Sequence, residues 1–491
     1  MSTRNAAGPK IIQGGMGVAV SGWPLARAVS MTGQLGVVSG TALEVVCARR
    51  LQRGDPGGHV RRALAHFPLP QAAQRIVGAY YRPADAGHDG GFRPTPRFTL
   101  RPGRALQELT IAANFVEVFL AKEGHDGIVG INYLRKIEMP LPFACYGALL
   151  AGVDHVLVGA GNPAELPGLL DRLAAGEPAS LSVRVQGATT QDGEFAARFD
   201  PRDLFGPSPP VLRRPRLDAI VASVDLAAAL AANPVTRPDG FVVEGYRAGG
   251  HNAPPRGPRR FDESGQPLYD ERDEVAPDAL HALGVPYWMA GSYGTPNALA
   301  AALAAGASGV QVGTLFALCQ ESGMAPHCKQ RLLALAAEGR ERVRTDDRVS
   351  PTGFPFKVAD LPGTLSDEQT YQQRPRLCDL GVLRSAYRKP DGSVGYRCPS
   401  EPVAIYTERH GGRSANAAAR RCLCNALLAT AGLAQQRPDG YTEPPIVTSG
   451  TDYTGVRALL SQAPDGQTYT ARDAVAYLLG NKRQVAVTPK P

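Results

Sequence analysis

The sequence predicts an α/β protein built on an eight-stranded parallel (β/α)8 barrel. Short apolar segments alternate with stretches rich in alanine and leucine, as in mostly parallel α/β folds. Several apolar segments run directly into glycines, and in such a barrel the strand ends form the ligand-binding face. The expected strands are residues 10–13, 35–39, 127–133, 154–159, 218–223, 240–244, 286–290 and 309–312.

The helices between these strands are expected to be crossover connections. Residues 297–305 are almost entirely alanine and leucine, and Pro296 and Gly306 mark the two ends. At 491 residues and 43% hydrophobic content, the chain is long enough for a sizeable core and for more than one structural unit. We therefore expect residues 1–357 to form the barrel and residues 358–491 to form a C-terminal subdomain.

Three insertions interrupt the expected barrel, at about residues 42–126, 180–215 and 252–277. The first has a helical start, a middle rich in glycine, proline and arginine, and a second helix at 106–122, and we expect it to cover the ligand site. The second contains a strand-like run at 181–186 and a proline-rich loop, which predicts a surface hairpin. The third follows His251 directly and is expected to be an active-site loop, with a merely solvated basic loop as the alternative.

The C-terminal subdomain is expected to depend on cysteines. From Ala359 onward there is no clear alternation of strands and helices, and four of the eight cysteines lie in this part of the chain. Four thiols can hold a zinc ion or an iron–sulfur cluster, whereas the alternative is a set of buried apolar thiols. The candidate metal ligands are Cys378, Cys398, Cys422 and Cys424.

Charge and hydropathy limit the partners of the protein. The net charge is +8, but the basic residues are spread along the chain and aromatic residues make up only 7%, which argues against nucleic acid as a partner. The charge instead suits steering of anionic small molecules. No apolar run is long enough for a membrane span and no signal peptide is evident, so we expect a cytoplasmic protein. The oligomeric state stays open, and a homo-oligomer is one of the states it allows.

Four segments in which a strand runs into glycine predict one site that binds a phosphate-bearing cofactor. Backbone N–H groups at glycine turns can hold a phosphate without a lysine. Tight turns without a ligand explain each segment alone, but they explain four at one barrel face poorly. The phosphate residues are expected to be Gly249, Gly250, Gly291, Ser292, Gly313 and Thr314, and the residues beside a flat ring Gly14, Gly15, Met16 and Gly17.

A further glycine pair does not predict a dinucleotide site. Gly159, Gly161 and Ala164 have the spacing of the dinucleotide-binding fingerprint and follow an expected strand. That fingerprint also needs an acidic residue at the end of the next strand, and residues 181–186 contain none. We therefore interpret this segment as an ordinary turn.

Several of these motifs together resemble a known family, the nitronate monooxygenases (2-nitropropane dioxygenase-like). The same motifs are shared by flavin-containing enoyl-acyl-carrier-protein reductases. The resemblance covers about residues 10–357, including a Thr-Gly-Phe-Pro segment at 352–355. It is carried by Ile-Ile-Gln-Gly-Gly-Met at 11–16, Leu-Gly-Val-Val-Ser-Gly at 35–40, Gly-Ile-Asn-Tyr at 130–133, Ala-Gly-Gly-His at 248–251, Ala-Gly-Ser at 290–292 and Gln-Val-Gly-Thr at 311–314.

The resemblance implies a TIM barrel with non-covalently bound FMN. By position, residues 14–17 would touch the isoalloxazine, Asn132 would hydrogen-bond to the flavin, and the glycine turns would hold its phosphate. The same motifs add Ser39, Gly40, Ala290 and Gln311 to the cofactor-binding residues. His251 would be the catalytic residue, as a base or hydrogen-bond donor, with a purely structural histidine as the alternative. Ser292 stands where the family usually has a second glycine.

The function implied by the resemblance is that of an FMN-dependent oxidoreductase of the nitronate monooxygenase type. A small anionic substrate or NAD(P)H would reduce the flavin, and oxygen or another acceptor would reoxidise it. One alternative is an NAD(P)H-dependent enoyl reductase acting on a carrier-bound acyl chain. Another is a non-catalytic flavoprotein or interaction subunit. Arg256, Arg259 and Arg260 are candidates for meeting a carboxylate, a phosphate or a pantetheine-linked carrier.

Overall fold

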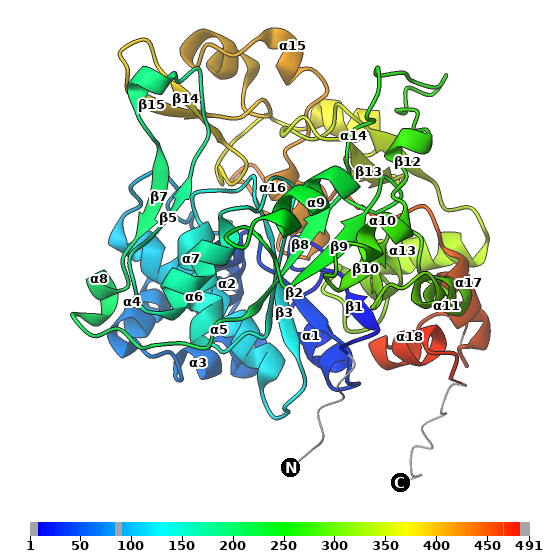
Figure 1. Cartoon of the computed structure of the whole chain (residues 1–491). Coiled ribbons are helices and arrows are strands. Elements are labelled where there is room, and N and C mark those ends of the chain that lie inside the picture. The colour runs from blue at the N-terminus through cyan, green and yellow to red at the C-terminus, as the bar shows by residue number, and fades with distance from the viewer. Residues whose placement is uncertain (1–7, 84–90, 465, 482–491) are drawn as a thin grey trace.

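A closed barrel of eight parallel strands forms the centre of the protein (Figure 1). The computed structural model describes residues 8–83, 91–464 and 466–481. The ring closes where the backbone N–H of Gln13 donates to the carbonyl of Leu35 at 2.9 Å, and that of Leu35 donates to Ile11 at 3.1 Å. Neighbouring barrel strands follow one another in chain order, so the predicted (β/α)8 barrel is confirmed. The strands are β1 (Ile11–Gln13), β2 (Gly36–Ser39), β3 (Val129–Leu134), β4 (His155–Gly159), β8 (Arg216–Val221), β9 (Gly240–Glu244), β10 (Tyr287–Ala290) and β11 (Gly309–Val312).

Apolar side chains fill the inside of the barrel. They come from strands all around the ring and form one small cluster, separate from the larger clusters beneath the helices. The barrel is therefore a packed core and not a pore, and a ligand has to bind at the ends of the strands. The fully buried members of the cluster are Ile12, Leu35, Val37, Leu157 and Val242.

Helices surround the barrel, as the sequence predicts. In α11 the hydroxyl of Thr295 accepts a hydrogen bond from the N–H of Ala298 at 3.2 Å, and Pro296 is the first helical residue. Among the described residues, no helix has both the length and the apolar character needed to cross a membrane. The helices outside the insertions and the C-terminal region are α1 (Trp23–Ser30), α6 (Leu141–Leu150), α7 (Leu166–Ala174), α9 (Val224–Ala232), α10 (Pro277–His281), α11 (Pro296–Ala304), α12 (Thr314–Ala317) and α13 (Pro326–Ala337).

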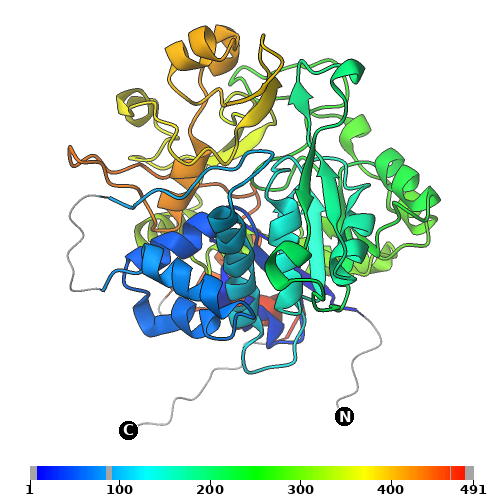
Figure 2. The same ribbon diagram turned by 90° about the vertical axis from the view of Figure 1, so that its left-hand side faces the viewer.

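The helices of the first insertion pack on the outside of the barrel (Figure 2). Its longest helix, α5, contacts α1, α2 and α6 and is buried along most of its length. Of its described residues, only Ala42 lines the main cavity, so the expectation that this insertion covers the site is wrong. Part of its glycine- and proline-rich middle lies outside the described residues. Its elements are α2 (Leu43–Gln52), η1 (Pro56–Gly58), α3 (His59–Leu64), α4 (Pro70–Tyr80) and α5 (Arg104–Lys122).

The second insertion contains the predicted hairpin. Strands β5 (Ala179–Ser182) and β7 (Ala196–Phe199) pair in antiparallel fashion. Between them, β6 (Val185–Gln186) pairs with β14 (Ser385–Arg388) of the C-terminal region. The hairpin therefore joins the barrel to the last part of the chain. Its remaining elements are η2 (Thr190–Asp192) and α8 (Arg202–Phe205).

The C-terminal region packs against the barrel. Val447, Tyr453 and Leu459 belong to the same buried apolar cluster as Phe241 and Val243 of β9. In Figure 1, α17 and α18 lie beside α11 at the lower right. The boundary at residue 357 stays a prediction, but the chain beyond it is not isolated from the barrel. The elements from residue 343 on, besides β14, are β12 (Val343–Asp346), β13 (Phe356–Ala359), α14 (Glu368–Gln373), β15 (Val394–Arg397), η4 (Ile405–Arg409), α15 (Ser414–Ala417), α16 (Leu423–Thr430), α17 (Thr454–Gln462) and α18 (Ala471–Leu478).

Candidate functional site

A cavity of about 460 Å3 opens at the carboxyl ends of the barrel strands. His251 and all but one of the predicted cofactor residues line it. Gly40 is the exception: a Cβ at this position would lie 2.2 Å from the ring of Tyr133, so this glycine serves packing. The predicted cofactor residues that line the cavity are Gly14, Gly15, Met16, Gly17, Ser39, Asn132, Gly249, Gly250, Ala290, Gly291, Ser292, Gln311, Gly313 and Thr314.

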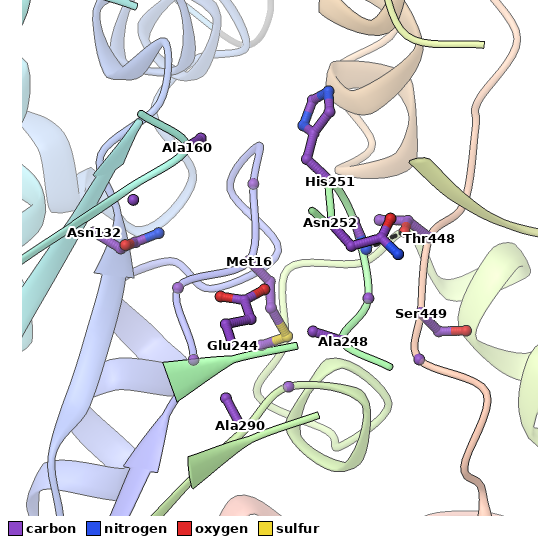
Figure 3. A pocket seen from close by; sticks show the side chains of 18 of the residues that line it. Met16, Asn132, Ala160, Glu244, Ala248, His251, Asn252, Ala290, Thr448 and Ser449 are labelled. Atoms are coloured by element: carbon purple, nitrogen blue, oxygen red, sulfur yellow. Dashed lines mark hydrogen bonds between the residues drawn. The ribbon is translucent and has the colours of Figure 1, made fainter. Parts of the chain in front are cut away.

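The loop after β1 brings its backbone close to the neighbouring strands. A Cβ on Gly15 would lie only 2.3 Å from Cβ of Asn132, so no larger residue fits without a shift. The N–H of Met16 donates to the hydroxyl of Ser21 at 2.6 Å, which ties the loop back on itself. Figure 3 shows the side chains of Met16 and of Glu244, which ends β9, among those that line the cavity. The loop backbone therefore forms part of one wall of the cavity.

Three residues that line the cavity carry a buried amide oxygen without a hydrogen-bond partner: Asn252, at Oδ1, and two of the predicted cofactor residues. The latter two oxygens are Oδ1 of Asn132 and Oε1 of Gln311, and no described residue donates to either. Leaving a buried acceptor unsatisfied costs about 1–3 kcal/mol. A ligand that presents N–H or O–H donors would satisfy both. Both residues were predicted to bind the cofactor, so this observation fits a flavin ring system.

The three glycine turns of the predicted phosphate cradle converge on the same cavity. Ser292 has φ of +63°, a left-handed conformation that favours glycine. This explains why a glycine usually occupies the position in the resembled family. Gly291 and Gly250 also have positive φ, at +93° and +76°. These turns therefore depend on residues that tolerate left-handed backbone.

A C-terminal segment completes this cradle, and the sequence prediction did not include it. The N–H of Gly250 donates to the hydroxyl of Thr448 at 2.8 Å, and the N–H of Gly450 donates to that of Thr314 at 2.8 Å. Thr448 and Ser449 lie beside the glycine turn that follows Ala248 (Figure 3). A sequence signal exists, because the apolar pair at 446–447 runs into Ser449 and Gly450 in the same way as the other glycine segments.

His251 is neutral in this environment. Burial lowers its pKa well below 6.5, and the charge of Lys136 lowers it further. Its Nε2 lies 2.6 Å from the hydroxyl of Ser350 and 3.3 Å from that of Thr352. The ring packs edge-on against Phe356 with 4.9 Å between centroids. A neutral, held imidazole suits hydrogen bonding to a substrate better than strong base catalysis.

Glu244 and Lys136 are two buried ionisable groups that influence one another's pKa, and the sequence prediction did not include them. Burial raises the pKa of Glu244 to about 7, against the opposing charge of Lys136. Burial likewise lowers the pKa of Lys136 to about 7. Nζ of Lys136 lies 4.8 Å from the ring centroid of Phe354 and has no hydrogen-bond partner among the described residues. The sequence feature that could have pointed to this pair is Glu244 itself, an acidic residue at the end of an apolar strand.

The raised pKa of Glu244 predicts a pH dependence of stability. Its folded-state value of about 7 lies above the model-compound value of 4.5, so the stabilising contribution is complete below about 4.5 and is lost as the pH rises through about 7. Glu244→Gln should remove this dependence, which amounts to about 3 kcal/mol. Denaturant unfolding at pH 5 and pH 8 measures it, with the exposed Glu263→Gln as the control. The same pH dependence in both variants would contradict the assignment.

The third insertion borders the cavity only at its start. Asn252, Ala253 and Pro254 line the cavity, so the loop reaches the candidate site at these residues, and its role as an active-site loop stays a prediction. The three candidate arginines further along are bound within the protein: the guanidinium of Arg256 donates to the carbonyl of Ala222, Arg259 lies 3.9 Å from Asp347, and Arg260 lies 3.0 Å from Asp270. Arg247, which precedes the glycine turn, is the arginine that lines the cavity.

The glycine pair set aside above also borders this cavity. Gly159, Ala160 and Gly161 follow β4 and line the wall, with Ala160 visible in Figure 3. Together with the other glycine segments, they place most strand ends of the barrel around a single site.

The four C-terminal cysteines meet, but not as metal ligands. Cys378, Cys398, Cys422 and Cys424 all line one small cavity of about 10 Å3. Within the described part of the chain, however, no three histidine, cysteine or acidic side chains are arranged to hold a metal ion. The structure therefore supports the predicted gathering of the thiols and not the predicted zinc or iron–sulfur site.

The fold and the cavity define an α/β-barrel protein with a ligand site at the strand ends. Residues 213–346 match the family model for nitronate monooxygenase, which confirms the resemblance inferred from the sequence. A probable nitronate monooxygenase of Bacillus subtilis (strain 168) is 38% identical over 98 residues, or 19% of this chain and 26% of that protein. The (3aS,4S,5R,7aS)-5-hydroxy-7a-methyl-1-oxo-octahydro-1H-indene-4-carboxyl-CoA dehydrogenase of Rhodococcus jostii (strain RHA1) is 32% identical over 129 residues, or 26% and 31%. The matches thus span about a third or less of these relatives.

Solved structures with low sequence identity were also found. FabK from Thermotoga maritima has a TM-score of 0.46 and 14% identity, covering 97% of this chain and 93% of that one. Nitroalkane oxidase from Streptomyces ansochromogenes has a TM-score of 0.41 and 17% identity, covering 96% and 95%.

Proposed function

We propose that this protein is an FMN-dependent oxidoreductase of the nitronate monooxygenase type that acts on a small anionic substrate. The observation that carries the proposal is the meeting of the predicted cofactor residues around one cavity. Two features of that cavity support a flavin: the glycine turns that leave room for a phosphate, and the unpartnered amide oxygens of Asn132 and Gln311. The match of residues 213–346 to the family model supports the same reaction class.

Different residues of the cavity would bind the cofactor, bind the substrate and exchange a proton in such a reaction. The backbone of residues 14–17, with Asn132 and Gln311, would hold the ring, and the glycine turns would hold the phosphate. FMN, when bound, supplies the electron-transfer chemistry. The neutral imidazole of His251 would hydrogen-bond to the substrate and stabilise negative charge on it. Glu244, with its pKa near 7, would exchange a proton at neutral pH.

A carrier-bound or coenzyme-bound acyl substrate is the second candidate. Much of the cavity wall away from the glycine turns is apolar, as an acyl chain would require. One relative is itself named as a dehydrogenase of a carboxyl-CoA compound. The two candidates differ in the reductant, because an enoyl reductase is reduced by NAD(P)H alone. Anaerobic addition of NADPH and, separately, of a nitronate distinguishes them. The apolar wall residues include Ile137, Ile220, Leu226, Phe354 and Leu427.

The purified protein is expected to be yellow and to release one FMN per chain on denaturation. The reason is the convergence of the glycine turns on one phosphate-sized site. Absorption spectroscopy and chromatography of the released flavin measure this. A colourless protein that cannot be reconstituted with FMN would refute the proposed function.

A further inference from the structure

A thiol pair lies in the wall between the two cavities. Cys422 immediately precedes α16, and Cys424 is the second residue of that helix. All four C-terminal thiols line the small cavity, but Cys424 also lines the large one. Leu423 and Leu383 also line both cavities and complete the wall between them. Cys424 thus connects the small cavity, where Cys422 is buried, to the proposed flavin site.

The two thiols share the wall of the small cavity and interact with one another there. The side-chain amide of Asn425 donates to Sγ of Cys422, at 3.6 Å. Both cysteines are free in the structure, and neither is paired in a disulfide. Sγ of Cys422 therefore lies beside a second thiol and a hydrogen-bond donor, an arrangement that suits a reactive sulfur.

We propose that Cys422 and Cys424 form a redox-active dithiol that exchanges two electrons with the flavin of the main cavity. When the pair is oxidised, an S–S bond forms between the two sulfurs, and two electrons and two protons pass to the oxidised flavin. In the reverse direction, reduced flavin delivers two electrons and two protons, the S–S bond breaks and both thiols are restored. This inference rests on the proposed function, because the flavin is the partner of the exchange.

The remaining features of the thiol cluster agree with this assignment. The interaction with Cys424 lowers the pKa of Cys422, which favours this sulfur as the nucleophile of the pair. Burial instead raises the pKa of Cys378 and Cys398, which stay protonated. The four thiols are not arranged as ligands of a metal ion within the described residues. The pair at 422 and 424 is therefore the reactive one.

An anaerobic reductive titration of the holoprotein tests the coupling to the flavin. The air-oxidised wild type should take up four electrons per flavin from dithionite, two for the flavin and two for the disulfide. Cys424→Ser should take up two, and Cys328→Ala, which changes a buried cysteine of α13 outside both cavities, should take up four. An uptake of two electrons by the wild type overturns the proposal.

Mass spectrometry tests the disulfide without relying on flavin or on the variants. The wild type is treated with oxidised glutathione, quenched with acid, unfolded and alkylated. It should then yield one peptide with a Cys422–Cys424 disulfide. Reduction before alkylation should abolish this disulfide. Alkylation of both cysteines after oxidation, or stoichiometric zinc or iron in the fresh protein, overturns the dithiol. A colourless protein that still forms the disulfide refutes the proposed function and the flavin coupling but retains the redox pair.

Discussion

Replacing Gly249 with alanine is expected to weaken FMN binding by about 10- to 100-fold. A Cβ at this position would lie 2.7 Å from the carbonyl carbon of Ser449 and 2.8 Å from the backbone nitrogen of Gly450. These are backbone atoms, so the C-terminal segment would have to move away from the glycine turn. Such overpacking costs about 1–3 kcal/mol, and 1.4 kcal/mol corresponds to tenfold in affinity. Fluorescence titration of the flavin-free protein with FMN measures the change.

Gly245→Ala is the matched control for this variant. Gly245 lies four residues earlier after the same strand, does not line the cavity, and a Cβ there would contact no atom within 4 Å. Its FMN affinity should equal that of the wild type. Equal affinity for Gly249→Ala as well would show that the C-terminal segment is not part of the cofactor site.

Replacing His251 with alanine is expected to lower kcat by about a hundredfold while FMN stays bound. The imidazole lines the cavity and is held by Ser350 and Thr352, so its loss removes a positioned hydrogen-bonding group without opening the glycine turns. Because burial keeps its pKa well below 6.5, the ratio of wild-type to variant rates should not change between pH 7 and pH 9. Steady-state kinetics measure both the loss of kcat and its pH dependence, with the compound that reduces the flavin as the substrate.

The exposed His281→Ala is the control for a general effect of removing a histidine. It lies in α10 and does not line the cavity, so its rates should match those of the wild type. An unchanged kcat for His251→Ala would leave His251 with a structural role in holding residues 350–352 beside the cavity. A ratio that changes steeply above pH 7 would instead indicate that the imidazole titrates during turnover.

The barrel alone does not complete the site at the main cavity. Barrel strands supply Asn132, Gln311 and the residues after β9, whereas Thr448 and Gly450 come from the last quarter of the chain. Segments so far apart in sequence meet only because the C-terminal helices pack against the barrel. A truncation near residue 357 is therefore not a test of the barrel by itself.

The sequence by itself determined the strands and the glycine turns. Strand identity is a local property, because an apolar run of four to six residues between turn signals is recognisable wherever it packs. The glycines after β1 and β9 can also be read from the sequence, although the reason for them is tertiary: a Cβ on Gly15 would meet Asn132, and one on Gly249 would meet the backbone of residues 449–450. The predicted cofactor residues therefore lie around the cavity, with Gly40 as the exception, whereas Glu244 and Thr448 were not predicted.

Only the tertiary structure decided the electrostatics of the site and the role of the C-terminal region. The pKa values of Glu244 and Lys136 depend on burial, which is created by elements far apart in the chain. Four cysteines in one part of the sequence predicted a metal site; the structure brings them to one small cavity, but no such metal-ligand group is found among the described residues. Composition and spacing show which groups are available, whereas distances and solvent exposure show what those groups can do, and these arise only when the chain is folded.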